Sequence, residues 1–119
     1  MVNFMEIQEV MSTIEQRLNK AKIEKEKLES TIKKYESSDD LLDSLPQVYY
    51  KKDGAMYIYF SGGKSLYIKS KERDKVLEQV KKRQEYERIL ALHKTLTSFI
   101  NKVEFTLREL AFEDISDRL

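Results

Sequence analysis

The sequence predicts an α+β domain made of a long helix, a three-stranded antiparallel β-meander and a second long helix. The only proline, all three glycines and five of the seven tyrosines lie between positions 45 and 69 of the 119 residues. Within this stretch, Asp53-Gly54 and Gly62-Gly63 separate three short β-prone runs, which is typical of strands joined by tight turns. The flanking segments lack both glycine and proline, and the whole chain is expected to form a single domain, residues 1–119.

The first helix is expected over residues 3–36, because its apolar positions alternate at spacings of three and four, as in a coiled-coil seam. Lys25 is the one charged residue in this seam. Two roles are open for it: it selects the register or the oligomeric state, or its side chain extends past its neighbours so that the ammonium group stays in water. Serines and aspartates then end the helix, and residues 38–45 are expected to form a short helix or turn. The seam consists of Phe4, Ile7, Met11, Ile14, Leu18, Ala21, Lys25, Leu28, Ile32 and Tyr35.

The expected register of the meander, residues 47–69, follows from counting outward from two-residue loops. This count pairs Tyr49 with Ile58 and Tyr57 with Ile68, and it places apolar and aromatic side chains on both faces. Such a sheet is expected to be covered by helix on one face and by a partner or ligand on the other. Alternatively, tyrosines tolerate a thinly covered surface because they are half polar. One face would carry Val48, Tyr50, Tyr57, Tyr59, Leu66 and Ile68, and the other Tyr49, Met56, Ile58, Phe60 and Tyr67.

The second helix is expected over residues 71–112, as one helix or as two that bend near positions 84–88. The two long helices are expected to fold back as an antiparallel hairpin. From Ile89 onward the apolar stripe is too wide for one neighbour to bury, which predicts a homodimer or higher oligomer. The candidate oligomer interface consists of Leu92, Leu96, Phe99, Val103 and Phe105.

Positive charge gathers on the meander and the start of the second helix. Residues 47–75 carry seven basic and three acidic groups, although the whole chain has a net charge of only +1. A basic, tyrosine-rich surface is a candidate for binding nucleic acid or a protein partner. The candidate binding residues are Lys51, Lys52, Tyr57, Tyr59, Lys64, Tyr67, Lys69, Lys71 and Arg73.

No catalytic, metal-ligating or cofactor-binding pattern is found. Cysteine is absent, and the single histidine, His93, lies on the apolar stripe, where a core or interface position is expected. Gly62-Gly63-Lys64-Ser65 lacks the first glycine of a phosphate-binding loop and joins two strands. The chain is therefore expected to be neither an enzyme nor cofactor-dependent. No membrane span or signal peptide is found, so a cytoplasmic location is expected.

The tyrosine-rich hairpin around Gly62, Gly63 and Lys64 leads into a charged helix that contains Tyr86 and Ile89. In this order of features, residues 45–105 resemble small uncharacterised proteins of bacteria and archaea that are associated with phages and transposons. The resemblance implies a mobile-element setting and carries no known activity.

The strand Tyr57-Ile58-Tyr59-Phe60, followed by a basic turn and a helix, is also similar to the arm-type DNA-binding domain of tyrosine recombinases. In that domain the sheet lies in the major groove of DNA. The similarity implies that Lys51, Lys52, Lys64 and Lys69 contact phosphates, whereas the alternative is a solubilising rim of lysines around the sheet.

Three functional hypotheses follow. The chain is a non-catalytic protein of a phage or mobile element that binds nucleic acid, or a nucleic-acid-associated protein, through the meander. Alternatively, it is an inhibitor that binds a protein of a host defence system, or a structural coiled-coil adaptor.

Overall fold

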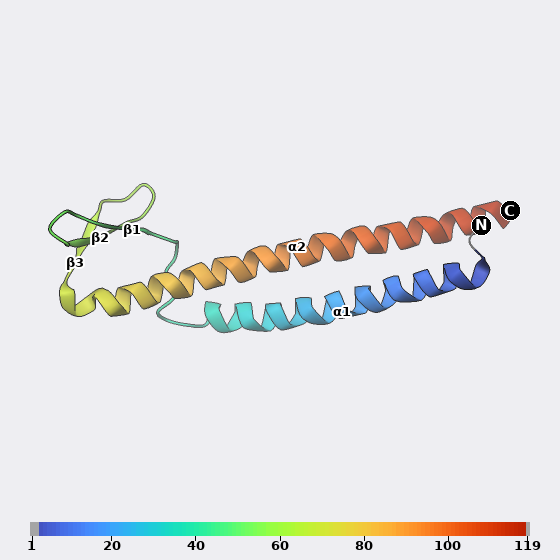
Figure 1. The fold of residues 1–119 in the computed structure, drawn as a ribbon, viewed down its shortest axis with the longest axis horizontal. Coiled ribbons are helices and arrows are strands. Elements are labelled where there is room, and N and C mark those ends of the chain that lie inside the picture. The colour runs from blue at the N-terminus through green and yellow to red at the C-terminus, as the bar shows by residue number, and fades with distance from the viewer. Residues whose placement is uncertain (1–2, 119) are drawn as a thin grey trace. The chain divides into compact units, whose positions relative to one another are not determined.

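The computed structural model describes the backbone of residues 3–118 and the side chains of residues 3–110. In chain order, its elements are helix α1 (Phe4–Glu36), strands β1 (Gln47–Tyr50), β2 (Met56–Tyr59) and β3 (Leu66–Ile68), the short 3-10 helix η1 (Ser70–Glu72) and helix α2 (Arg73–Arg118) (Figure 1). The expected α+β order of long helix, meander and long helix is confirmed. The chain forms two compact units. One joins the segment up to Thr31 with the segment from Ala91 onward, and the other is Ile32–Leu90.

The boundaries of the helices differ from expectation mainly after the meander. α1 ends at Glu36, as expected, and residues 38–45 form a turn, which is one of the two alternatives expected, with the Leu41 N–H donating to the Ser38 carbonyl at 3.4 Å. Residue 71 lies in η1, and α2 begins at Arg73. α2 then runs unbroken to Arg118, beyond the expected end at residue 112, because no glycine or proline interrupts it.

In the first unit, α1 and the later part of α2 lie side by side and antiparallel (Figure 1). The seam expected for α1 faces α2 here: every seam position from Met11 to Leu28 is buried or half-buried, whereas Phe4 and Ile7 are exposed. Lys22 Nζ also lies 3.0 Å from Glu104 Oε1 on the facing helix. The centre of this packing consists of Leu18, Ala21 and Ile100, with Leu96, Val103 and Leu107 around them.

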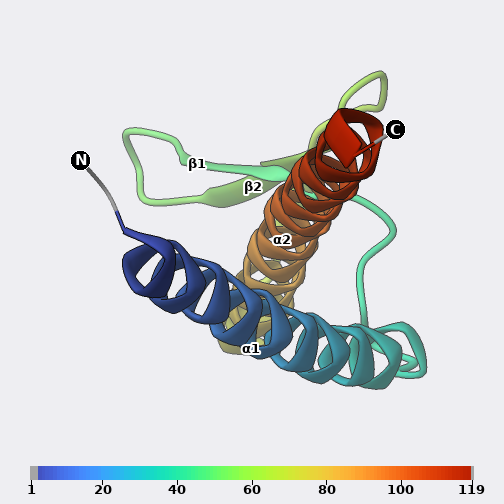
Figure 2. The ribbon, with the colours of Figure 1, turned by 90° about the vertical axis from the view of Figure 1, so that its right-hand side faces the viewer.

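In the second unit, the three strands form an antiparallel sheet in the order β1-β2-β3. Figure 2 shows β1 and β2 side by side with the loop that joins them. One face of the sheet packs against the first turns of α2, and Met56 at its centre is fully buried, with 0% of its surface exposed. The core of this unit consists of Met56, Ile58 and Ile68, with Val48, Phe60 and Val76 packed against them.

The expected register is wrong by one residue at both turns. Tyr49 pairs with Tyr57, and Tyr57 with Tyr67, where the two-residue loops had paired Tyr49 with Ile58 and Tyr57 with Ile68. The physical reason is that each loop contains one more residue than expected.

Glycine conformations explain the longer loops. In the first loop, the Gly54 N–H donates to the Lys51 carbonyl at 2.8 Å, and Gly54 adopts a φ of 86°, as in a hairpin whose turn is followed by a left-handed glycine. In the second loop, the Gly63 N–H donates to the Phe60 carbonyl at 2.8 Å, and Gly62 adopts a φ of 79° at the third position of the turn, where a type II turn requires a positive angle.

The corrected register sorts the side chains cleanly. Residues that pair across strands share a face, so the aliphatic residues of all three strands gather on the side of α2. The expected assignment of residues to the two faces is therefore wrong for β1 and β3, whose residues lie on the face opposite to the one expected relative to β2. Tyr50 is the one tyrosine of the three strands on the side of α2. The opposite face carries four tyrosines, namely Tyr49, Tyr57, Tyr59 and Tyr67.

Candidate functional site

The face of the sheet turned away from α2 is the candidate binding surface, and we call its four tyrosines, Tyr49, Tyr57, Tyr59 and Tyr67, the tyrosine face. They share it because tyrosine alternates with an aliphatic residue along β2 and β3 and because the register sets Tyr57 between Tyr49 and Tyr67. Three of the predicted binding residues, Tyr57, Tyr59 and Tyr67, are thus brought together. Tyr49 completes the set and was not among the predicted binding residues. The two-residue loops had placed both Tyr49 and Tyr67 on the face opposite Tyr57.

Three of these rings form a ladder across the strands. The Tyr49 and Tyr57 rings are stacked with their centroids 5.5 Å apart and their planes 12° apart. The Tyr57 and Tyr67 centroids are also 5.5 Å apart, but their planes are inclined at 60°, an edge-to-face contact. Such contacts restrain the rings before any ligand arrives. Tyr57 at the centre is half-buried, whereas Tyr49 and Tyr67 are 38% and 55% exposed.

Lysines border the tyrosine face. Lys51 Nζ lies 4.5 Å from the centroid of the Tyr57 ring, a cation–π contact that holds the ammonium group over the sheet. The backbone at Lys69 is extended, with φ −61° and ψ 146°, so the alternation of β3 continues and puts Lys69 on the same side as Tyr67. Lys52 and Lys64 are exposed next to the two glycine turns.

The remaining predicted basic residues lie off the sheet. Lys71 is exposed in η1, and Arg73 is half-buried at the start of α2, where its Nε is buried and makes no hydrogen bond with the described residues. No residue of β1, β2 or β3 is acidic, and Asp53 in the first loop accepts a hydrogen bond of 3.0 Å from the Ala55 N–H through Oδ1. The surface therefore presents aromatic rings and cations without neighbouring carboxylates on the strands.

A polar cluster in the same unit holds the turn after α1 to α2. The rings of Tyr86 and Tyr35 are in tilted contact, with their centroids 5.8 Å apart and their planes inclined at 42°. The Tyr86 hydroxyl donates a hydrogen bond of 2.9 Å to Glu36, and the pKa of Tyr86 is raised, first by burial and then by this bond. Lys82 Nζ lies 2.6 Å from Asp40 Oδ1. No partner of the Tyr86 hydroxyl was expected from the sequence, because that partner depends on how the turn folds.

His93 contacts a charged side chain of the facing helix. Its Nε2 lies 3.0 Å from Glu29 Oε1 on the facing helix of the first unit, and Lys25 Nζ lies 3.8 Å from the same carboxylate oxygen. Lys25 thus reaches a charged partner from its seam position. Within the part of the chain that the structure describes, no three potential metal ligands gather at one point.

The predicted oligomer interface separates into two groups. Leu96 and Val103 pack against the buried cluster of the first unit, so they contribute to packing within the chain. Leu92, Phe99 and Phe105 are 47%, 45% and 59% exposed. Phe99 borders an apolar groove of about 440 Å³ between α1 and α2, whose walls include Ile14, Val103 and Leu107.

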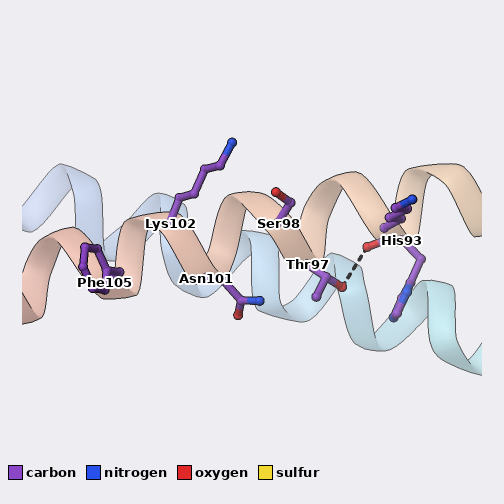
Figure 3. Close-up of a pocket in the computed structure, with 7 residues that line it drawn as sticks. His93, Thr97, Ser98, Asn101, Lys102 and Phe105 are labelled. Atoms are coloured by element: carbon purple, nitrogen blue, oxygen red, sulfur yellow. Dashed lines mark hydrogen bonds between the residues drawn. The ribbon is translucent and has the colours of Figure 1, made fainter.

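A second groove, of about 610 Å³, runs along α2 from His93 to Phe105 (Figure 3). It is open to solvent, and its side chains point in different directions: Lys102 and Asn101 extend to opposite sides of the helix. The Thr97 hydroxyl is bonded to the His93 carbonyl of the preceding turn at 2.8 Å. These groups do not converge on a common point.

None of the helices in the described part of the chain has an apolar stretch long enough to cross a membrane. Comparison of the chain with protein-family models, with curated proteins and with solved structures found no match.

Proposed function

We propose that the chain is a non-catalytic binding protein that holds nucleic acid against the tyrosine face of its sheet. The observation that supports this best is the combination on one surface of four tyrosines with bordering lysines and no acidic residue on the strands. Nucleic acids carry both features that such a surface complements, namely regularly spaced phosphates and planar aromatic bases.

Lysines supply the affinity for phosphate in this proposal. Neutralising a phosphate with a lysine releases a condensed counterion, so the logarithm of the binding constant falls linearly with the logarithm of the salt concentration. The seven basic and three acidic groups of residues 47–75 favour a polyanion. The candidates for direct contact are Lys51 and Lys69 on the tyrosine face, and Lys52 and Lys64, which are exposed beside the two glycine turns.

The test measures binding of labelled DNA and RNA by fluorescence anisotropy over a range of salt concentrations. We expect binding that weakens steeply with salt. Changing Lys51, Lys52 and Lys64 together to serine should reduce the salt slope by up to about 3 units, roughly one for each lost contact. The matched control changes the exposed α1 residues Lys20, Lys33 and Lys34 to serine, which alters the net charge equally and should leave the slope unchanged. Absence of binding at low salt would overturn the proposal.

A protein partner is the second candidate, and the position of Tyr57 favours it. Tyr49 stacks on this ring, Tyr67 contacts it edge-on and Lys51 lies over it, so little of it is free for a base. Ordered tyrosines with a polar tip suit the centre of protein interfaces. Such a partner would be a nucleic-acid-associated protein or a component of a host defence system. A pull-down from host lysate with and without nuclease separates the candidates: a stoichiometric protein retained after nuclease treatment supports this one.

The biological setting and the assembly complete the proposal. The resemblance of residues 45–105 to phage- and transposon-associated proteins supports a role in a mobile element, acting in the cytoplasm, where nucleic acid is accessible. The exposed Leu92, Phe99 and Phe105 in the first unit support a homodimer, because contact with a second copy would remove their apolar surface from water.

A further inference from the structure

We infer that the tyrosine face selects single-stranded over duplex nucleic acid, with unpaired bases stacking on the outer sides of Tyr49 and Tyr67. This inference rests on the nucleic-acid binding proposed above and specifies the substrate class. It follows from the geometry of the ring ladder, from the residue types on this face and from the position of the two tyrosines on the edge strands.

The two ends of the ladder differ from its centre. Tyr57 on the middle strand has a neighbouring ring on each side, at 5.5 Å in both directions. Tyr49 and Tyr67 lie on the edge strands β1 and β3, and neither has a further aromatic neighbour among the residues that the structure describes. A base placed outside Tyr49 would continue the nearly parallel stack of Tyr49 on Tyr57, and Tyr67 offers a second platform at the other edge.

Stacking requires bases whose faces are free. In a duplex both faces of an interior base are covered by its neighbours, so a tyrosine ring gains no stacking contact there, whereas a single strand can turn its bases outward. Sequence readout in a duplex groove depends instead on groups that bond to base edges, chiefly arginine, asparagine and glutamine. Gln47 is the only residue of these types on the three strands.

Preorganisation supports the same conclusion. The rings are already restrained by contact with one another, and Lys51 is held over Tyr57, so binding orders few side chains. Lys51 and Lys69 lie on this face, where their ammonium groups can meet the phosphates that connect the stacked bases. The surface thus offers aromatic platforms and cations together, which is the combination that single-strand binding proteins use.

The experiment compares binding of a short labelled oligothymidylate with binding of the duplex it forms with oligoadenylate. We expect the single strand to bind at least tenfold more tightly at equal salt. Tyr49→Leu and Tyr67→Leu should each weaken single-strand binding about tenfold, within the range for loss of one stacked base, and leave duplex binding unchanged. Tyr49→Phe and Tyr67→Phe should bind normally, because the ring is retained.

The matched control is Tyr50→Leu. Tyr50 lies on the same edge strand as Tyr49, is also exposed, and points to the opposite face of the sheet, so its replacement should not affect binding. Circular dichroism and thermal melting establish that each variant is folded. Equal affinity of the Tyr49→Leu, Tyr67→Leu and Tyr50→Leu variants, or a preference for duplex, would overturn this inference and leave the proposed function standing. Absence of binding to either nucleic acid would remove both.

Discussion

Lys82 on α2 is bonded to Asp40 in the turn after α1, with 2.6 Å between Nζ and Oδ1. This bond, followed by one from the Ser38 hydroxyl, lowers the pKa of Asp40 from 3.8 to about 2. A carboxyl group whose pKa is lower in the folded state stabilises the fold above its unfolded pKa and loses that contribution as the pH falls through the folded one.

We therefore predict that the stabilising effect of Asp40 declines as the pH falls from about 4 through about 2. Above pH 5 the Asp40→Asn variant should unfold at lower urea concentration than the wild type, and the difference should vanish only below about pH 2. Urea titrations across this range measure the difference. Asp39→Asn serves as the control, because its exposed side chain makes no ion pair with the residues that the structure describes. A difference between wild type and Asp40→Asn that is constant with pH would contradict the assignment.

Met56 provides the test of the sheet core. It is the most completely buried side chain of its cluster, so Met56→Ala should lower the free energy of unfolding by about 2–5 kcal/mol through lost contacts and the cavity left behind. Leu66 on β3 lies on the same face but is 53% exposed, and Leu66→Ala should cost less than half as much. If chemical denaturation showed equal losses in the free energy of unfolding for Met56→Ala and Leu66→Ala, the sheet would pack differently.

Gly54 tests the longer loop. A side chain there meets no other atom within 4 Å, so the cost of Gly54→Ala comes from the backbone, whose φ is 86°. We expect a loss of about 1–2 kcal/mol in the free energy of unfolding, the cost of a left-handed conformation for an ordinary residue. Gly54→Asn should lose less, because asparagine tolerates this conformation. If the Gly54→Ala variant were as stable as the wild type, the loop would be of another type.

The exposed apolar residues of the first unit predict self-association. Light scattering should report a homodimer at micromolar concentration, and changing Phe99 and Phe105 to serine should shift it to a monomer of about half the mass. Leu77→Ser, at an exposed position of α2 in the other unit, is the control and should remain a dimer. A wild type with the 14.2 kDa mass of one chain at all these concentrations would rule out the dimer.

His93→Gln tests the role of the single histidine. Glutamine can donate a hydrogen bond to Glu29 in place of the imidazole, so the variant should lose at most about 1–2 kcal/mol of stability. The metal content measured by elemental analysis and the affinity for nucleic acid should be the same as in the wild type. Loss of a stoichiometric metal would show that His93 is a ligand.

The helices could be predicted from the sequence because their signals are local. The spacing of the α1 seam identified Leu18 and Ala21 as inward positions, and the serines and aspartates after Glu36 marked the end of the helix. The absence of glycine and proline also favoured one unbroken second helix, but its expected end at residue 112 was too early.

The face of each tyrosine could not be predicted, because it depends on a single residue of loop length. Asp53-Gly54 and Gly62-Gly63 are compatible with loops of two or three residues. Changing the first loop from two to three residues moves each side chain of β1 to the opposite face of the sheet relative to the side chains of β2. Tyr49 and Tyr67 were therefore placed on the face opposite Tyr57. The alternation within β2, with Met56, Ile58 and Phe60 on one face and Tyr57 and Tyr59 on the other, is local and was predicted correctly.

This alternation also limits how the chain can change in length during evolution. Insertion of one residue inside β2 would turn the following tyrosines towards Val76 and expose the following aliphatic residues. The two glycine loops can absorb an added residue without moving the strands. Natural variation in length within the meander should therefore be confined to these loops, and a change inside a strand should survive only with a second one that restores the alternation.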